Sequence, residues 1–569
     1  MKVLHVVGAL CGLLGSASAL DRGAFTFTNY ELNARLEPEQ ARLAVRGRIT
    51  LRNDSAIAQK DLALQISSSL NWSSIQRNGG FLQFTTHQYT SDIDHTGALS
   101  EAIVTLPQAV APKAEIELQV GYEGIITLDA TRLTRIGVPD EKAWHSDWDQ
   151  IGKSFTAVRG IGYVVWYPVA TEAASLSDGN SVFATVGNWK RREAGSNLRL
   201  GLCVVSNTAQ SVLMNDSTPA ADEPAKPAAG TSCSQHFFRP LGQTAPAFVA
   251  GSYMELGNSA VRVLCLPEHK AAAESYALAS QLDVPLVTGW FGPPRRKTEV
   301  AELADADASP FESGGLVLTP LAGNDSRAYQ LTAVHQLTHA AFFSPRPWIY
   351  EGLAHFAQAL EREQQSGRQA ALDFMGTRRN AIAEVEKSIA AQPGQNAAAD
   401  ESLINTTTEE FYRSKAMYVW WMLREMIGDA ALQKALGAYH ADQDREAAYM
   451  QHLIEAQTKR DLEWFFDDWV YRDHGLPDLR VESAYPRETV DGHYVVTVTV
   501  ENLGAAGAEV PLTLHFAGGE ETKRLEVRAK AKAVTRFEAN VAPQEITVND
   551  GSVPESDIGN NRFKIEMAK

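Results

Sequence analysis

Two histidines and a glutamate in segment 331–356, LTAVHQLTHAAFFSPRPWIYEGLAHF, have the spacing of metal ligands. His335 and His339 are four residues apart, so on a helix their rings would lie one turn apart on the same face. Glu351 follows after eleven intervening residues, at the expected start of a second helix. Two imidazoles and one carboxylate leave the fourth position of a tetrahedral ion open, as in catalytic zinc sites. The segment therefore predicts a site for one zinc ion.

The residue after the first histidine does not fit the usual catalytic motif. Zinc peptidases with a His-Glu-x-x-His motif carry a glutamate there, as the general base that takes a proton from the attacking water. This chain has Gln336, and a neutral amide cannot accept that proton. General-base catalysis contributes about 10²–10⁴ in rate, so its loss should cost about 3 to 5 kcal/mol of barrier lowering. Zinc binding should persist, because Gln336 is not a predicted ligand.

Length and charge limit what surrounds this segment. The chain has 569 residues, which is enough for three or four domains, each with its own core. It carries 52 basic and 69 acidic side chains, a net charge of -17. Nucleic-acid binding needs a basic surface, so we expect no nucleic-acid partner. The sequence carries no prediction of the oligomeric state.

The first 19 residues have the pattern of a secretory signal peptide. Lys2 precedes an apolar run over residues 3–14, and the small residues Ala17 and Ala19 frame the expected cleavage site. The run is shorter than the roughly twenty apolar residues of a membrane span, and no comparable segment follows. We therefore expect an exported mature chain, periplasmic or secreted, without a transmembrane segment.

Three cysteines remain after the predicted cleavage: Cys203, Cys233 and Cys265. An oxidising compartment allows one disulfide and one leftover thiol. A Cys203–Cys233 bond is our preferred pairing, because it would tie down the Pro- and Ala-rich stretch between them. Three buried thiols without a bond are the alternative.

Hydropathy patterns divide the mature chain into three domains. Alternation with period two, as in residues 43–51 and 114–122, predicts a large all-β domain of antiparallel strands over residues 20–255. Within it, the Ala-, Pro- and Ser-rich segment 208–234 predicts a surface loop. Helical patterns dominate residues 256–478. Alternation returns over residues 479–569, which predicts a small β-sandwich of the immunoglobulin type. The predicted fold class is multidomain α+β.

Several motifs around the predicted zinc ligands occur together in one known family. A strand with the sequence FESGGL covers 311–316, FYRSKAMY covers 411–418, and LEWFFDDW with GLP closes the helical region at 462–477. With these motifs the chain resembles the aminopeptidase N-like zinc metallopeptidases, which are gluzincins with a thermolysin-like catalytic domain. The resemblance covers nearly the whole mature chain and implies an N-terminal β-saddle, a mostly helical thermolysin-like zinc domain and a C-terminal sandwich.

The resemblance also implies roles for individual residues. Glu312 takes the position that holds the free amino group of a peptide substrate, with Gly314 and Gly315 beside it in the same motif. The family's transition-state tyrosine falls on Arg413, and Tyr412 is one position away, rotated by about a quarter turn on a helix. The spacing from the second histidine to the glutamate ligand is shorter than is usual in the family, although it matches shorter relatives of the clan.

Simpler explanations compete with each of these assignments. The two histidines could be satisfied by neighbours on a buried helix, and Glu351 could be an acid favoured by the helix dipole. Glu312 could be a strand-edge acid, and a packing role suits Tyr412 better than a catalytic one.

Two functions remain open. One is an exported zinc-binding homologue that binds a peptide or protein but hydrolyses it poorly or not at all. The other is an active zinc aminopeptidase that uses a different proton acceptor.

Overall fold

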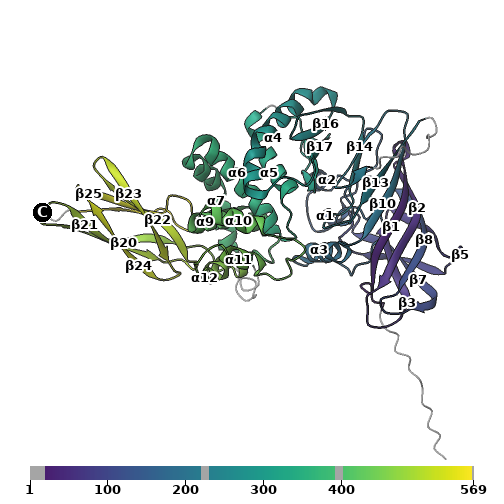
Figure 1. Ribbon diagram of the computed structural model, residues 1–569, viewed down its shortest axis with the longest axis horizontal. Helices are drawn as coiled ribbons and strands as arrows, with labels where there is room; N and C mark the ends of the chain where they lie inside the picture. The colour runs from purple at the N-terminus through teal and green to yellow at the C-terminus, as the bar shows by residue number, and fades with distance from the viewer. Residues whose placement is uncertain (1–19, 220–229, 324, 391–401, 567–569) are drawn as a thin grey trace, which may run out of the picture.

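The structure is a computed structural model that describes residues 20–219, 230–323, 325–390 and 402–566. Three units follow one another along an elongated molecule: sheets of the N-terminal part, then helices, then sheets of the C-terminal part (Figure 1). This order confirms the predicted multidomain α+β class. The predicted signal peptide, residues 1–19, lies outside the described residues. Among the described helices, none combines the length and apolar character that crossing a membrane requires.

An eight-stranded sheet forms the largest part of the N-terminal unit, in the order β12-β13-β10-β1-β2-β8-β4-β5. Inward residues alternate with outward ones along its strands, which is the period that the sequence showed. All its neighbouring strands are antiparallel except β1 and β10, which run parallel. The strands are β1 (Phe25–Glu37), β2 (Arg42–Asn53), β4 (Leu70–Arg77), β5 (Gly80–Phe81), β8 (Glu115–Ile125), β10 (Asn197–Val205), β12 (Thr218–Pro219) and β13 (Thr231–Phe238).

Two smaller sheets complete this unit. One has the order β3-β7-β6 and the other β11-β14-β9. Their strands are β3 (Gln59–Ser67), β6 (Phe84–Thr90), β7 (Ala98–Val110), β9 (Phe155–Val158), β11 (Ser211–Met214) and β14 (Phe248–Gly251). A 3-10 turn, η1 (Pro38–Gln40), joins β1 to β2.

Two expectations for this unit were wrong. The unit is not all-β, because it contains α1 (Thr131–Arg135), α2 (Asp140–Ser146) and α3 (Ser181–Glu193). The predicted loop 208–234 contains β11, β12 and the start of β13, while residues 220–229 lie outside the described residues. Both errors concern segments whose local composition is polar or mixed. Their structure comes from pairing or packing with distant strands, which the local pattern does not encode.

The preferred disulfide is present. Cys203 and Cys233 are directly opposite each other on the antiparallel strands β10 and β13, and their sulfurs are bonded. Cys265 is a free, buried thiol on β16 (Val261–Cys265).

The middle unit combines a five-stranded sheet with the helices that carry the predicted site. The sheet order is β15-β16-β17-β19-β18, with β16, β17 and β19 parallel and β18 antiparallel at the edge. Its strands besides β16 are β15 (Met254–Gly257), β17 (Thr298–Leu303), β18 (Phe311–Ser313) and β19 (Leu316–Pro320).

The long helices of this unit pack around an aromatic core in which Trp348, Trp420 and Trp421 are fully buried. These tryptophans fill space between helices. The elements are η2 (Pro267–His269), α4 (Lys270–Phe291), α5 (Ser326–Ala341), α6 (Pro347–Ser366), α7 (Arg368–Ala390), the π-helix η3 (Glu410–Lys415), α9 (Ala416–Ile427), α10 (Asp429–Gly437), α11 (Tyr449–Glu455), α12 (Glu463–Phe466) and the π-helix η4 (Asp467–Tyr471).

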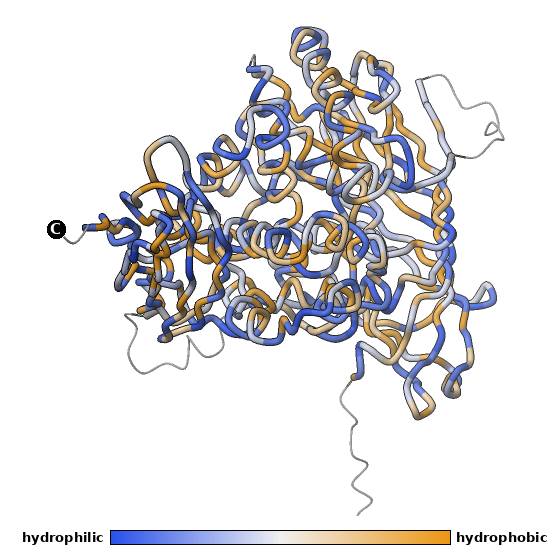
Figure 2. The backbone as a smooth tube through the Cα atoms, turned by 60° about the vertical axis from the view of Figure 1, so that its left-hand side comes forward, coloured by the Kyte–Doolittle hydropathy of each residue, from blue (hydrophilic) through white to orange (hydrophobic). Residues whose placement is uncertain are grey.

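Two antiparallel sheets form the C-terminal sandwich, in the orders β20-β21-β24 and β23-β22-β25-β26. Hydrophobic and hydrophilic residues alternate along these strands (Figure 2), and the inward ones form the core between the sheets. The strands are β20 (Leu479–Glu488), β21 (Tyr494–Asn502), β22 (Ala508–Phe516), β23 (Gly519–Val527), β24 (Lys532–Ala539), β25 (Pro543–Val548) and β26 (Arg562–Lys564).

Candidate metal centre

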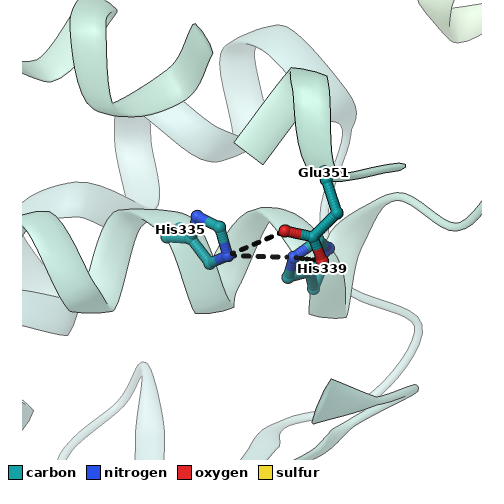
Figure 3. A group of neighbouring side chains, drawn as sticks. All are labelled: His335, His339 and Glu351. Carbon is teal, nitrogen blue, oxygen red and sulfur yellow. Dashed lines mark hydrogen bonds and ion pairs between the residues drawn. The ribbon is translucent and has the colours of Figure 1, made fainter. Parts of the chain in front are cut away.

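The three predicted ligands come together from two helices. His335 and His339 lie on one face of α5, and Glu351 projects from the first turns of α6 with its carboxylate beside both rings (Figure 3). Asp325 caps α5 by accepting a hydrogen bond of 2.9 Å from the backbone N–H of Arg327. Pro347 occupies the first turn of α6, where its missing N–H costs nothing. Local sequence signals thus start both helices at the positions that the site needs.

The donor atoms have the separations of a tetrahedral zinc site. The two Nε2 atoms are 3.1 Å apart, and oxygens of Glu351 lie 3.9 Å from Nε2 of His335 and 3.5 Å from Nε2 of His339. Two ligands bound at about 2.0–2.1 Å with a tetrahedral angle would lie about 3.3 Å apart. The three separations bracket that value, and two imidazoles with one carboxylate suit zinc. The residues present therefore fit one zinc ion.

The site is closed on one side and open on the other. The His339 side chain is 0 % exposed, whereas His335 and Glu351 are each 18 % exposed. Burial, reinforced by the neighbouring His339 and His355, holds the pKa of His335 well below its usual range, so its imidazole is neutral. Burial opposes ionisation of Glu351, but the hydrogen bond and charge of His339 outweigh it and lower the pKa. A neutral imidazole and an ionised carboxylate are the forms that bind metal.

Aromatic packing orients the two imidazole rings. The ring of Tyr350 lies 3.8 Å from that of His339, and the ring of His355 lies 4.9 Å from that of His335. Neither ligand's Nδ1 has a hydrogen-bond partner among the described residues. Metal-bound histidines usually donate this second N–H to a carboxylate or carbonyl, which strengthens metal binding. Among the described residues, aromatic packing rather than a second hydrogen bond therefore holds the orientation of the two rings.

Gln336 is buried beside the ligands, with both ends of its amide engaged. The hydroxyl of Tyr276 on α4 donates to its Oε1 at 2.7 Å, and its Nε2 donates to Oε1 of Glu312 at 3.0 Å. Gln336 is only 1 % exposed, so these two bonds fix its orientation. The amide nitrogen meets a carboxylate and the amide oxygen meets a phenol, which is the arrangement that satisfies all three groups. The position of the general base in the motif is therefore occupied by an amide whose oxygen and nitrogen are both hydrogen-bonded to neighbouring side chains.

Glu312 lies on β18, at the edge of the sheet nearest to α5. Burial raises the pKa of its carboxyl. The turn that follows holds the two glycines of the motif. Gly314 has a φ of 56°, and a Cβ there would lie 2.0 Å from the carboxylate of Asp216. The N–H of Gly315 donates to that carboxylate at 3.0 Å, so the turn joins the middle unit to the N-terminal one.

Arg413, rather than Tyr412, reaches the metal ligands. Its Nε donates to Oε2 of Glu351 at 3.2 Å, and its Nη1 pairs with Glu409 at 2.9 Å. Tyr412 is 8 % exposed, and burial raises the pKa of its hydroxyl, so it is a neutral phenol. A guanidinium is a permanent cation that donates hydrogen bonds and accepts none. Arg413 can therefore stabilise negative charge next to the site but cannot remove a proton.

The contacts that Tyr276, Tyr350 and Arg413 make with the site were not predicted. Of these, only Arg413 had a signal, because it occupies the position of the family's transition-state tyrosine. Tyr276 comes from a helix sixty residues before Gln336, and only the packing of α4 on α5 brings the two together. Lys415, from the same motif as Arg413, is instead structural: it is buried and paired with Glu386 and Asp473 at 2.7 Å each.

Comparison with known proteins gives matches in structure but none in sequence. The chain matches no protein-family model and no curated protein sequence. It is similar to the crystal structure of a mutant M1 zinc metallopeptidase from Deinococcus radiodurans, with a TM-score of 0.52 and 17% identity, covering 81% of this chain and 97% of that one. The same mutant bound to a Tyr-Ser-Ala substrate matches with a TM-score of 0.51 and 16% identity over the same shares. The chain thus has the aminopeptidase N-like fold of M1 zinc metallopeptidases.

Proposed function

We propose that this chain is an exported, zinc-binding protein of the aminopeptidase N-like type, in which peptide hydrolysis is impaired or absent. The observation that carries the proposal is Gln336, a buried amide that donates to Glu312 at the position of the general base. Because this nitrogen already donates and the oxygen accepts from Tyr276, neither end of the amide can take a proton from water.

His335, His339 and Glu351 would hold the zinc ion, which supplies a Lewis acid that polarises a carbonyl and acidifies water. Glu312 would bind the α-ammonium group of a peptide, because its carboxylate accepts a hydrogen bond from Gln336, the chain neighbour of the ligand His335. A cation in that place would offset the burial that raises the pKa of Glu312. The site would therefore keep the ability to bind a peptide by its amino end while lacking the group that activates water.

The alternative is an active zinc aminopeptidase with another proton acceptor. One observation favours it: the carboxylate of Glu312 is 3.0 Å from the nitrogen of Gln336, next to the normal base position. Burial also raises the pKa of Glu312, which makes it a better proton acceptor at neutral pH. In that case the carboxylate of Glu312 would have to bind the substrate amine and also accept the proton from water.

Mass spectrometry of peptides incubated with the zinc-loaded protein separates these two functions. The proposal expects peptides to bind and remain intact, or to lose their first residue slowly. Rapid release of N-terminal residues that stops on chelation and returns with zinc would establish the active enzyme instead. Export is tested separately, by fractionating cells and sequencing the mature N-terminus, which should begin at Leu20.

A further inference from the structure

A cavity of about 670 Å³ lies between α3 of the N-terminal unit and three segments of the middle unit, 345–347, 404–406 and 442–445. Its volume is within the range of small-molecule and peptide pockets, roughly 300–1,000 Å³. Pro347 in its wall starts the helix that carries Glu351, four residues later. At 1.5 Å per residue, that is about 6 Å along the helix axis. One wall of the cavity therefore lies about one helical turn from Glu351.

The lining of the cavity is basic although the chain is acidic. Four arginines and two aspartates line it, a difference of +2, whereas the whole chain has a net charge of -17. Arg346 is paired with Asp444 at 2.6 Å, and Arg192 with Glu193 at 2.9 Å. Arg191 on α3 donates a hydrogen bond to the side-chain oxygen of Asn188, but neither Arg191 nor Arg445 on the other wall forms an ion pair with a carboxylate in the described part of the chain. Two guanidinium groups, one from each unit, are thus available to an anion.

Other groups in the lining suit a peptide better than an inorganic ion. Gln243 lines the cavity, and its buried Oε1 has no hydrogen-bond partner among the described residues, so the wall contains an unsatisfied acceptor. Phe183 on α3 is 52 % exposed and offers an apolar surface next to the arginines. An acceptor, an aromatic face and two guanidinium groups together match an amide, a side chain and a carboxylate.

We propose that this cavity binds a carboxylate of a short peptide whose amino end is held near Glu312, so that the protein selects short or acidic peptides. The inference rests on the proposed function, because it assumes that a peptide occupies the metal centre. Each extended residue spans about 3.3–3.6 Å, so the roughly 6 Å along the helix from Glu351 to Pro347 corresponds to about two residues of an extended peptide. A free C-terminus and an acidic side chain offer the same carboxylate.

The test is calorimetric titration of the full-length, zinc-loaded protein with three peptides at low salt. These are tetra-alanine with a free C-terminus, the same peptide with a C-terminal amide, and the amide with glutamate at its third position. We expect the free acid to bind about tenfold more tightly than the neutral amide, because charge-assisted hydrogen bonds are about twice as strong as neutral ones. If only the glutamate peptide binds more tightly than the neutral amide, the carboxylate that the cavity binds comes from a side chain, and the cavity still has the proposed chemistry.

Variants locate this preference in the cavity. Arg191→Gln with Arg445→Gln should abolish the difference between the acid and the amide, whereas Arg487→Gln, on an exposed arginine of the C-terminal sandwich, should keep it. Gly187→Leu should weaken binding of all three peptides, because a Cβ at Gly187 meets only the end of Arg191 and the added side chain would enter the cavity.

Two results would overturn the inference: equal binding of the three peptides, or a preference that survives the double arginine variant. Zinc analysis of each sample keeps the two proposals apart. A protein that holds zinc but shows no carboxylate preference contradicts only the assignment of the cavity, whereas a folded protein that cannot bind zinc contradicts the proposed function.

Discussion

Restoring a carboxylate at the base position is the most direct perturbation of this site. In Gln336→Glu the hydroxyl of Tyr276 can still donate to the new side chain, because it donates to an oxygen now at 2.7 Å. The hydrogen bond of 3.0 Å to Glu312 is lost, and two carboxylates lie next to each other in its place. The variant should therefore gain a general base. Repulsion between the new carboxylate and Glu312 should at the same time raise the pH at which that base ionises.

The two effects can be weighed against each other. General-base catalysis is worth about 10²–10⁴ in rate, or about 3 to 5 kcal/mol. Two unit charges about 4 Å apart repel by about 4 kcal/mol at an effective dielectric constant near 20. That repulsion corresponds to about a thousandfold tighter proton binding by the pair, on top of the burial that already raises the pKa of Glu312. Because only the ionised form is a base, the rate gain should increase with pH.

Measurement of kcat/KM for peptide hydrolysis from about pH 5 to 9 tests this prediction. We expect Gln336→Glu to exceed the native protein by about 10²–10⁴ at alkaline pH, with the advantage shrinking as the pH falls. Combining it with Glu312→Gln should relieve the repulsion, so that the rate persists to lower pH while KM rises through loss of amine binding. A native protein as fast as the variant, with equal zinc in both, would refute the reasoning about Gln336.

Three further predictions concern the metal, the disulfide and a buried acid. His339→Ala should lower the zinc content from about one ion per chain to a small fraction by elemental analysis, while circular dichroism stays native, because the ligand set drops below three. Replacing Cys203 and Cys233 with alanine should lower the free energy of unfolding by about 3 to 4 kcal/mol in denaturant titrations, because the bond closes a loop with a sequence separation of 30. Asp283 is 2 % exposed, and burial, with the charge of Glu361, raises its pKa to about 8. The native state then keeps a proton that the unfolded chain has lost, so the free energy of unfolding should fall by about 3 to 6 kcal/mol as the pH rises from about 4 to about 8. Asp283→Asn should flatten that dependence, and an unchanged slope would show that Asp283 is ionised in the native state.

The sequence predicted the fold correctly in those regions where the hydropathy pattern is local and strong. Alternation with period two identified both β regions, and the helical periodicity identified the middle region. The errors were the helices α1, α2 and α3 of the N-terminal unit and the strands in segment 208–234. The α3 helix contains Gly187 and is largely polar, with Trp189 and Glu193 as its buried residues. Its stability comes from packing against the N-terminal unit, and such tertiary contacts override weak local propensity.

The sequence alone predicts the candidate metal ligands and the amide at the base position, because both predictions depend only on residue type and on spacing along two helices. His335 and His339 needed one helical turn, Glu351 needed the start of the next helix, and Gln336 needed only its chemical identity. The surroundings of the site were decided by tertiary structure. Tyr276 meets Gln336 through the packing of α4 on α5, and Arg413 reaches Glu351 from a π-helix 62 residues further along the chain. Such contacts depend on how separate elements pack in space, and no spacing within a single chain segment specifies them.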